Sequence, residues 1–237
     1  DVGPPAKPSF SKNSHAGCLS FELSDGKDLI VTNMGGTNEG YGGDNANLNH
    51  YARHTGAHST LCYKGENIVS ISENGFLKNN IFYTKFKKNK NEDGIWINAS
   101  HNGYQKTFGA IHTRALFLNK EGTDFRGEDE LKIYPRKFLG FLGWGNEKNI
   151  NLHFILHPKV SASLTQDGKA IIIRLAHGHG WVFRATGGEV KLEDALHSEK
   201  PSVRSKTLRI VVETSVSESN YSKINWQFKK VKDQISK

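Results

Sequence analysis

Short runs of β-forming residues, each ended by a turn signal, follow one another along almost the whole chain and constrain its fold more than any other feature. About twelve such strand candidates occur, and no long stretch has apolar residues at helical spacing. A Gly after Asp suits a tight hairpin turn, because both central residues tolerate positive φ. We therefore predict an all-β fold, a large antiparallel β-sandwich in a single domain over residues 1–237. The turn signals between paired runs are Asp25-Gly26, Asp167-Gly168 and Thr186-Gly187-Gly188.

The charge balance is basic, with 32 Lys and Arg against 24 Asp and Glu, a net +8 before eleven His are counted. Such an excess favours polyanionic partners through long-range attraction. Much of the surplus lies in KFKKNKN, residues 85–91, which we interpret as part of a hairpin tip, and in the tail KKVKDQISK. The pattern is compatible with two interpretations, a solvated surface and a surface that binds an acidic polysaccharide. Because the basic residues are scattered, nucleic-acid binding is not expected.

Other signals narrow the function classes. No apolar run approaches the roughly 18 residues needed to cross a bilayer, so we expect no membrane contact. The chain has no phosphate-binding loop, nucleophile elbow, CxxC pair or HExxH motif. Cys18 and Cys62 fall in strand candidates. They are interpreted as free buried thiols, with a disulfide as the alternative, since a disulfide needs Cα atoms within about 7 Å.

Two imidazoles and an amide occur in three neighbouring strand-like segments. His15 lies in SHAGCLSFELS, Asn33 ends KDLIVTN, and His58 lies in GAHSTLCY. Side chains of these types on adjacent strands could converge on one cation or on one sugar carboxylate. The trio is therefore the first candidate functional cluster.

Several sequence words together resemble the C-terminal domain of the heparinase II/III-like polysaccharide lyases. They are HAGCLSFEL, LIVTN and AHSTL, then WINASHNGY, FGAIHTRALFL, NLHFILHP and GWVFRA, spanning about Asp1 to Trp226. The resemblance implies a β-sandwich that lines a cleft shared with an N-terminal toroid of helices, and the toroid supplies the eliminating Tyr and the Asn or His. Nothing in this chain resembles that toroid. Residues 1–12 resemble the linker between the two halves.

The resemblance also implies a divalent metal site, for zinc or calcium, with His15, Asn33 and His58 as ligands. The family's first metal word reads like His-x-Asp, and here Gly17 replaces that acid. Its second ligand is an Asp at the end of a strand, and here Asn33 replaces it. Zinc prefers imidazoles together with an anionic ligand. A hydrogen-bonded His/Asn/His cluster without metal is therefore the alternative.

Further residues are candidates for substrate binding. Asn13 stands where some family members carry a catalytic His, and an Asn cannot shuttle protons but can donate a hydrogen bond to a sugar carboxylate. The polar, Gly-rich stretch from Met34 to Gly56 is predicted to be a long loop, and long loops are usually functional or mobile. Its residues Tyr51, Arg53 and His54 could meet a substrate, with the Arg recognising a carboxylate. A solvated loop is the alternative.

His112 and Arg114 share one face of a predicted strand. They could contribute to a polar surface between domains, or have a structural role inside this one.

The leading hypothesis from the resemblance is the C-terminal domain of a protein that cleaves an acidic, uronate-containing polysaccharide by β-elimination. Its partners would be that polysaccharide and the N-terminal toroid of the same protein, and the catalytic base would come from the toroid. The isolated chain would then be inactive, and its location periplasmic or otherwise extracytoplasmic. The alternative is a non-catalytic carbohydrate-binding or scaffolding β-sandwich, supported by Asn13, Gly17 and Asn33 in place of more reactive residues.

Overall fold

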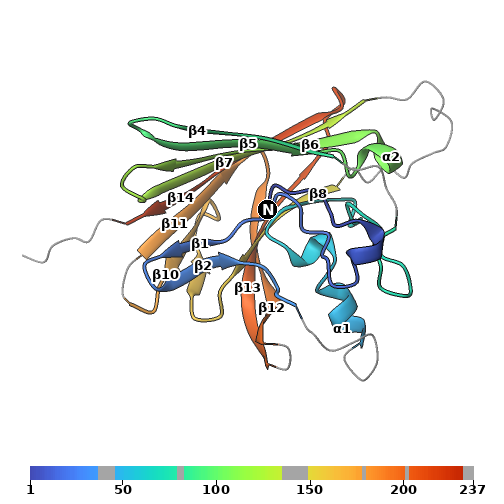
Figure 1. Ribbon diagram of the computed structural model, residues 1–237. Coiled ribbons are helices and arrows are strands. Elements are labelled where there is room, and N and C mark those ends of the chain that lie inside the picture. The colour runs from blue at the N-terminus through green and yellow to red at the C-terminus, as the bar shows by residue number, and fades with distance from the viewer. Residues whose placement is uncertain (37–45, 79–82, 135–148, 178–179, 201–202, 232–237) are drawn as a thin grey trace, which may run out of the picture.

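The computed structural model describes residues 1–36, 46–78, 83–134, 149–177, 180–200 and 203–231. Within these residues fourteen strands form two antiparallel sheets that pack face to face (Figure 1). The prediction of a large antiparallel β-sandwich is confirmed. No helix of the described residues is long and apolar enough to cross a membrane.

The six-stranded sheet has the order β1-β2-β8-β13-β12, with β3 also paired to β8. Its central strand is β8, whose Leu152 and Phe154 are completely buried. The hairpin predicted at Asp25-Gly26 joins β1 to β2, and Gly26 has φ +59° as that turn requires. The strands are β1 Leu23–Asp25, β2 Asp28–Thr32, β3 Leu61–Tyr63, β8 Asn149–Leu156, β12 Glu189–Lys200 and β13 Val203–Ser215.

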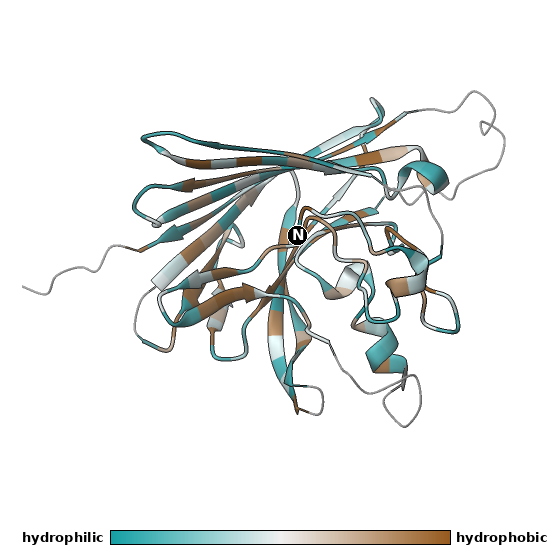
Figure 2. Cartoon of the chain, in the orientation of Figure 1, coloured by the Kyte–Doolittle hydropathy of each residue, from teal (hydrophilic) through white to brown (hydrophobic). Residues whose placement is uncertain are grey.

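The eight-stranded sheet has the order β4-β5-β6-β7-β14-β11-β10-β9. A hairpin is present here as β4 and β5, but the lysine-rich run is not its tip: it forms the edge strand β4, and only residues 91–93 make the turn. The edge strand is hydrophilic along most of its length (Figure 2). Charged side chains on an edge strand oppose pairing with other chains. The strands are β4 Thr84–Lys90, β5 Gly94–His101, β6 Ala110–Asn119, β7 Asp124–Ile133, β9 Ser161–Leu164, β10 Ala170–Arg174, β11 Gly180–Thr186 and β14 Tyr221–Lys230.

The third turn signal, at Gly187-Gly188, does not close a hairpin. β11 before it belongs to the eight-stranded sheet and β12 after it to the six-stranded sheet, so the chain crosses between the layers here. A β-carbon at Gly187 would lie 2.2 Å from the carbonyl oxygen of Lys223, and one at Gly188 would lie 2.7 Å from that of Glu213. The two glycines therefore allow this segment to pass close to the backbone at Lys223 and Glu213, where a side chain would clash.

Aromatic rings fill the space between the sheets. Phe154 of β8 meets Phe183, Trp226 and Phe228 of the opposite sheet at centroid distances of 5.2, 4.9 and 5.5 Å. The pairs with Trp226 and Phe228 are edge-on and the pair with Phe183 is tilted, and such contacts add to the free energy gained from burying the rings. The core is continuous across both sheets.

Short helices occur mainly in the segments outside the sheets. The predicted loop from Met34 to Gly56 contains α1 Ala46–Tyr51, and residues 37–45 of that loop lie outside the described residues. The N-terminal segment holds η1 Pro8–Phe10, and its linker role stays a prediction. The remaining helices are η2 Thr55–Ala57 and α2 Gln105–Phe108.

Both cysteines are free and buried, as predicted. Burial raises the pKa of the Cys18 thiol to about 12 and that of Cys62 to about 11. Neither thiol is therefore ionised at neutral pH.

Candidate functional site

The segments that carry the histidine pair are irregular, which corrects the strand assignments around both His15 and His58. Residues 13–22 precede the first strand, and Leu19 has φ +63°. A branched residue in the left-handed region cannot continue an extended strand. His58 ends the single turn η2, and Asn33 directly follows β2.

The structure brings His15 and His58 into contact. Nδ1 of His15 lies 3.3 Å from Nε2 of His58, and the ring centroids are 5.1 Å apart. His58 is only 5% exposed, and burial, with a smaller contribution from His15, lowers the pKa of His58 to about 3. Burial and then Arg53 also lower the pKa of His15. Both imidazoles are therefore neutral at physiological pH. In the hydrogen bond between them one ring donates and the other accepts, which leaves the donating ring with one free acceptor nitrogen.

Asn33 joins this pair through the main chain next to His58. Its side-chain Oδ1 accepts a hydrogen bond of 2.9 Å from the backbone N–H of Ser59, and its own carbonyl accepts one of 2.9 Å from His197 Nδ1. The hydroxyl of Ser59 in turn donates to Thr32 and accepts from the N–H of Ile155. The Asn33 amide and the Ser59 hydroxyl together hold the segment after His58 against β2 and β8.

The arrangement matches a metal site only in part. Two imidazole nitrogens bound at about 2.0–2.1 Å to one tetrahedral zinc lie about 3.3 Å apart, which is the separation of His15 and His58. Among the described residues, however, no group of three or more His, Cys, Asp or Glu side chains could hold a metal ion. The oxygen of Asn33 already accepts a hydrogen bond from Ser59. The ligand set is incomplete, so we derive no chemistry through a metal.

The position of the His58 ring explains why residue 17 is a glycine and not an acid. A β-carbon at position 17 would lie 2.7 Å from Cγ and Cδ2 of His58. The His58 ring therefore occupies the space that a side chain at Gly17 would need.

The predicted substrate-binding residues differ in how accessible they are. Arg53 is buried, and its Nε, Nη1 and Nη2 donate to the carbonyls of Ser14, Gly75 and Ser11 at 2.8, 2.7 and 3.0 Å. These bonds brace the N-terminal segment, so carboxylate recognition by Arg53 stays a prediction.

The other three predicted residues are more accessible. Tyr51 is 41% exposed, and its ring lies 5.8 Å from that of His54. Nε2 of His54 is 3.0 Å from Nδ1 of His50, and burial followed by His50 lowers the pKa of His54. Asn13 is exposed in a turn. Their contact with substrate stays a prediction.

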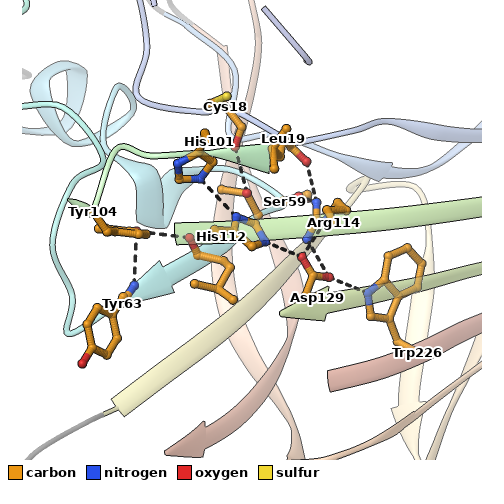
Figure 3. Close-up of polar contacts among 12 residues, drawn as sticks. Cys18, Leu19, Ser59, Tyr63, His101, Tyr104, His112, Arg114, Asp129 and Trp226 are labelled. Atoms are coloured by element: carbon orange, nitrogen blue, oxygen red, sulfur yellow. Dashed lines mark hydrogen bonds and ion pairs between the residues drawn. The ribbon is translucent and has the colours of Figure 1, made fainter. Parts of the chain in front are cut away.

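A buried polar network reaches Ser59, the residue that follows His58 (Figure 3). His112 and Arg114 of β6 are 0% and 1% exposed, so they lie inside the sandwich and do not form an interdomain surface. Arg114 donates from Nε and Nη2 to Asp129 of β7 at 2.7 and 3.2 Å, and Trp226 Nε1 donates to the same carboxylate at 2.7 Å. Burial alone would raise the pKa of Asp129, but Arg114 and the His112 hydrogen bond lower it to about 2.

The hydrogen bonds fix the tautomers of two buried imidazoles. The N–H of Gly103 donates to Nδ1 of His101, so a neutral His101 carries its proton on Nε2. That proton points to Nδ1 of His112 at 3.1 Å, and Nε2–H of His112 then donates to Asp129 at 2.7 Å. Burial lowers the pKa of both rings, in agreement with this neutral chain.

Arg114 connects the network to the histidine pair. Its Nη1 donates to the carbonyls of Leu19 and Ser59 at 2.6 and 2.9 Å (Figure 3). Ser59 directly follows His58, and Leu19 lies close in sequence to Gly17. Sequence reasoning missed Asp129 and Ser59. Only the strand register, which places Asp129 opposite Arg114, shows the role of the acid.

Two antiparallel sheets packed face to face, with an imidazole pair held in irregular segments outside them, define a large β-sandwich domain. The chain belongs to the heparinase II/III-like C-terminal family, which matches residues 1–227. It is also 27% identical over 254 residues to FtsZ-localized protein C of Caulobacter vibrioides (strain NA1000 / CB15N), covering 97% of this chain and 40% of that protein.

Solved structures of lyases have the same fold. The crystal structure of heparan sulfate lyase HepC from Pedobacter heparinus matches with a TM-score of 0.75 at 15% identity, over 99% of this chain and 33% of that one. Heparinase III matches with a TM-score of 0.67 at 18% identity, over 92% of this chain and 30% of that one. The chain thus spans about two-fifths of its curated relative and a third of the solved lyases.

Proposed function

We propose that this chain is the β-sandwich part of a protein that binds and cleaves an acidic, uronate-containing polysaccharide by β-elimination. The observation that carries the proposal is membership of the heparinase II/III-like family along residues 1–227. Elimination needs a base for the C5 proton, an acid for the leaving oxygen and a group that neutralises the carboxylate. In the proposal a helical toroid elsewhere in the protein supplies the base, and a periplasmic or extracytoplasmic location accompanies this role.

The neutral His15–His58 pair is the part of this chain best suited to meet the polysaccharide. A neutral imidazole can accept a hydrogen bond from a sugar hydroxyl or donate one to a carboxylate. The exposed Asn13 and Tyr51 and the partly buried His54 are the accompanying candidates for substrate contact. His15 is only partly buried, whereas His58 lies beneath it. We therefore assign the direct sugar contact to His15.

The test compares the isolated chain with the full-length protein on heparan sulfate and hyaluronan. Unsaturated uronate product is followed by its ultraviolet absorbance. We expect product from the full-length protein, none from the chain alone, and polysaccharide binding by the chain that His15→Ala weakens. Turnover by the isolated chain would contradict the division of labour, and absence of both product and binding would contradict the function.

A second candidate is a non-catalytic scaffolding module. It is favoured by the His58 ring lying over Gly17 and by the curated relative, whose name records localisation with FtsZ. On this proposal the full-length protein has no lyase activity and binds a partner protein. Co-sedimentation of the full-length protein with FtsZ polymers, together with the lyase assay, separates the two candidates. Binding without product supports the scaffold, and product without binding excludes it.

A further inference from the structure

A small cavity lies on the outer face of the six-stranded sheet, beneath the segment that carries Tyr51. Phe154 and Ile210 face the core, so their neighbours Ile155 and Arg209 point away from it. These outward residues, with Tyr51 and Gly56 above them, enclose a cavity of about 200 Å³. The space is smaller than the roughly 300–1,000 Å³ of pockets for drug-sized ligands. A cavity of this volume can hold one small ring.

The floor of the cavity is apolar. Met34, Ala57 and Ile155 line it and are buried together with Ala52 in a separate hydrophobic cluster, against which Leu196 packs. Met34 directly follows Asn33, and Ala57 directly precedes His58. The cavity therefore lies against the same two segments that position the candidate site.

Polar side chains line the walls of the cavity. The side chain of Arg209 is held by Glu193, which accepts from Nε at 3.0 Å and from Nη2 at 2.8 Å. Tyr51 is 41% exposed and offers a ring face and a hydroxyl. A rigid guanidinium beside an aromatic ring can bind a ligand that has both hydroxyls and an apolar face.

Gly56 lines the cavity and lies between two rings. A β-carbon at Gly56 would lie 3.6 Å from Oη of Tyr51 and 3.9 Å from Cε1 of His153. His153 is 5% exposed, and its Nδ1 has no hydrogen-bond partner within the described part of the chain. Burial, then Arg209, lowers the pKa of His153 to about 3. The imidazole therefore brings no positive charge to the cavity.

The charged side chains around the cavity favour an uncharged sugar over an acidic one. Glu193 already balances Arg209, and Asp194 also lines the cavity, so the pocket has no excess of positive charge to attract a carboxylate. A neutral pyranose has hydroxyls for Arg209 and Tyr51 and C–H faces for the apolar floor. We propose that this cavity binds one neutral hexopyranose unit. The inference rests on the proposed polysaccharide function and assigns to this pocket a neutral sugar of the chain in place of its uronate.

The experiment is a nuclear magnetic resonance titration of the isotope-labelled protein with N-acetylglucosamine and, separately, glucuronate. We expect N-acetylglucosamine to shift the amide signals of Gly56, Ala57 and Ala195. Glucuronate should bind at least about fivefold more weakly, because like charges oppose it. Arg209→Gln should weaken N-acetylglucosamine binding about tenfold, as expected for a lost hydrogen bond to a charged donor. Gly56→Leu should abolish binding by filling the space.

Arg126→Gln is the matched control, because Arg126 also pairs with a carboxylate but lies in the other sheet. It should bind N-acetylglucosamine as the wild type does. The inference is overturned if neither sugar shifts the pocket amides at tens of millimolar, if glucuronate binds as tightly, or if the control loses as much affinity. Polysaccharide binding by the full-length protein is measured separately, so failure of this pocket and failure of the proposed function give different results.

Discussion

The imidazole of His58 packs against Gly17, so close that a β-carbon at position 17 would be 2.7 Å from its Cγ and Cδ2. The contact couples two features that look independent in the sequence, the absence of an acid at position 17 and the placement of His58. Because the ring is 5% exposed, it has little room to move aside. An acid at this position would require a different arrangement of the histidine pair.

Gly17→Ala should therefore destabilise the protein. Overpacking a close contact in a buried region costs about 1–3 kcal/mol. The free energy of unfolding in urea measures the loss, and the ring signals of His58 should shift at the same time. Gly122→Asn is the control, since nothing lies within 4 Å of a β-carbon there and Asn tolerates its φ of +67°. Equal losses in the two variants would show that the His58 contact is not the cause.

Much of the fold could be predicted from the sequence because the local signals agree with the final pairing. The Asp25-Gly26 and Asp167-Gly168 turns each join adjacent antiparallel strands, with positive φ at the glycine. The crossing at Gly187 could not be distinguished from a hairpin, since both require Gly and only long-range packing decides between them.

The candidate site could be predicted only in part. The contact of His15 with His58 agrees with the predicted cluster, although neither histidine lies in a strand. Asp129 was missed because its partner Arg114 is fifteen residues away in sequence, and only the β6–β7 register brings them together. The cavity at Arg209 was missed because three distant strands and a loop build it.

Asp129→Asn should be strongly destabilising. The substitution keeps the shape but leaves the Arg114 guanidinium buried without its counter-charge, and breaking such a pair costs about 3–5 kcal/mol. Urea unfolding followed by Trp fluorescence measures it. Asp124→Asn is the control, because its partner Arg126 has a side chain that is 58% exposed and such pairs contribute about 0–1 kcal/mol. A loss at Asp129 no larger than at Asp124 would mean that the buried pair is not needed.

Stability should fall as the pH drops below about 6.5. The pKa values of His58 and His153 are lowered to about 3 by burial, so the unfolded chain binds protons between pH 6.5 and 3 that the folded chain does not. The stabilisation is present above the unfolded pKa and decreases with acidification, by up to about 2 kcal/mol per imidazole between pH 6.5 and 5. Urea unfolding at a series of pH values measures it. The His153→Gln variant should show a smaller dependence on pH, and an unchanged slope would contradict the assignment.

Asn33→Asp should increase zinc affinity at pH 7.5. His15 and His58 place two ring nitrogens 3.3 Å apart, and both can bind a metal once the proton between them moves to the other nitrogen of its ring. A carboxylate at position 33 could accept from Ser59 with one oxygen while offering charge through the other. We expect a gain of about tenfold or more, measured by competition with a chelating dye. In a His15→Ala background the same substitution should give no gain, because one of the two imidazole ligands is then missing. An equal gain in both backgrounds would place the zinc elsewhere and remove the metal role from the histidine pair.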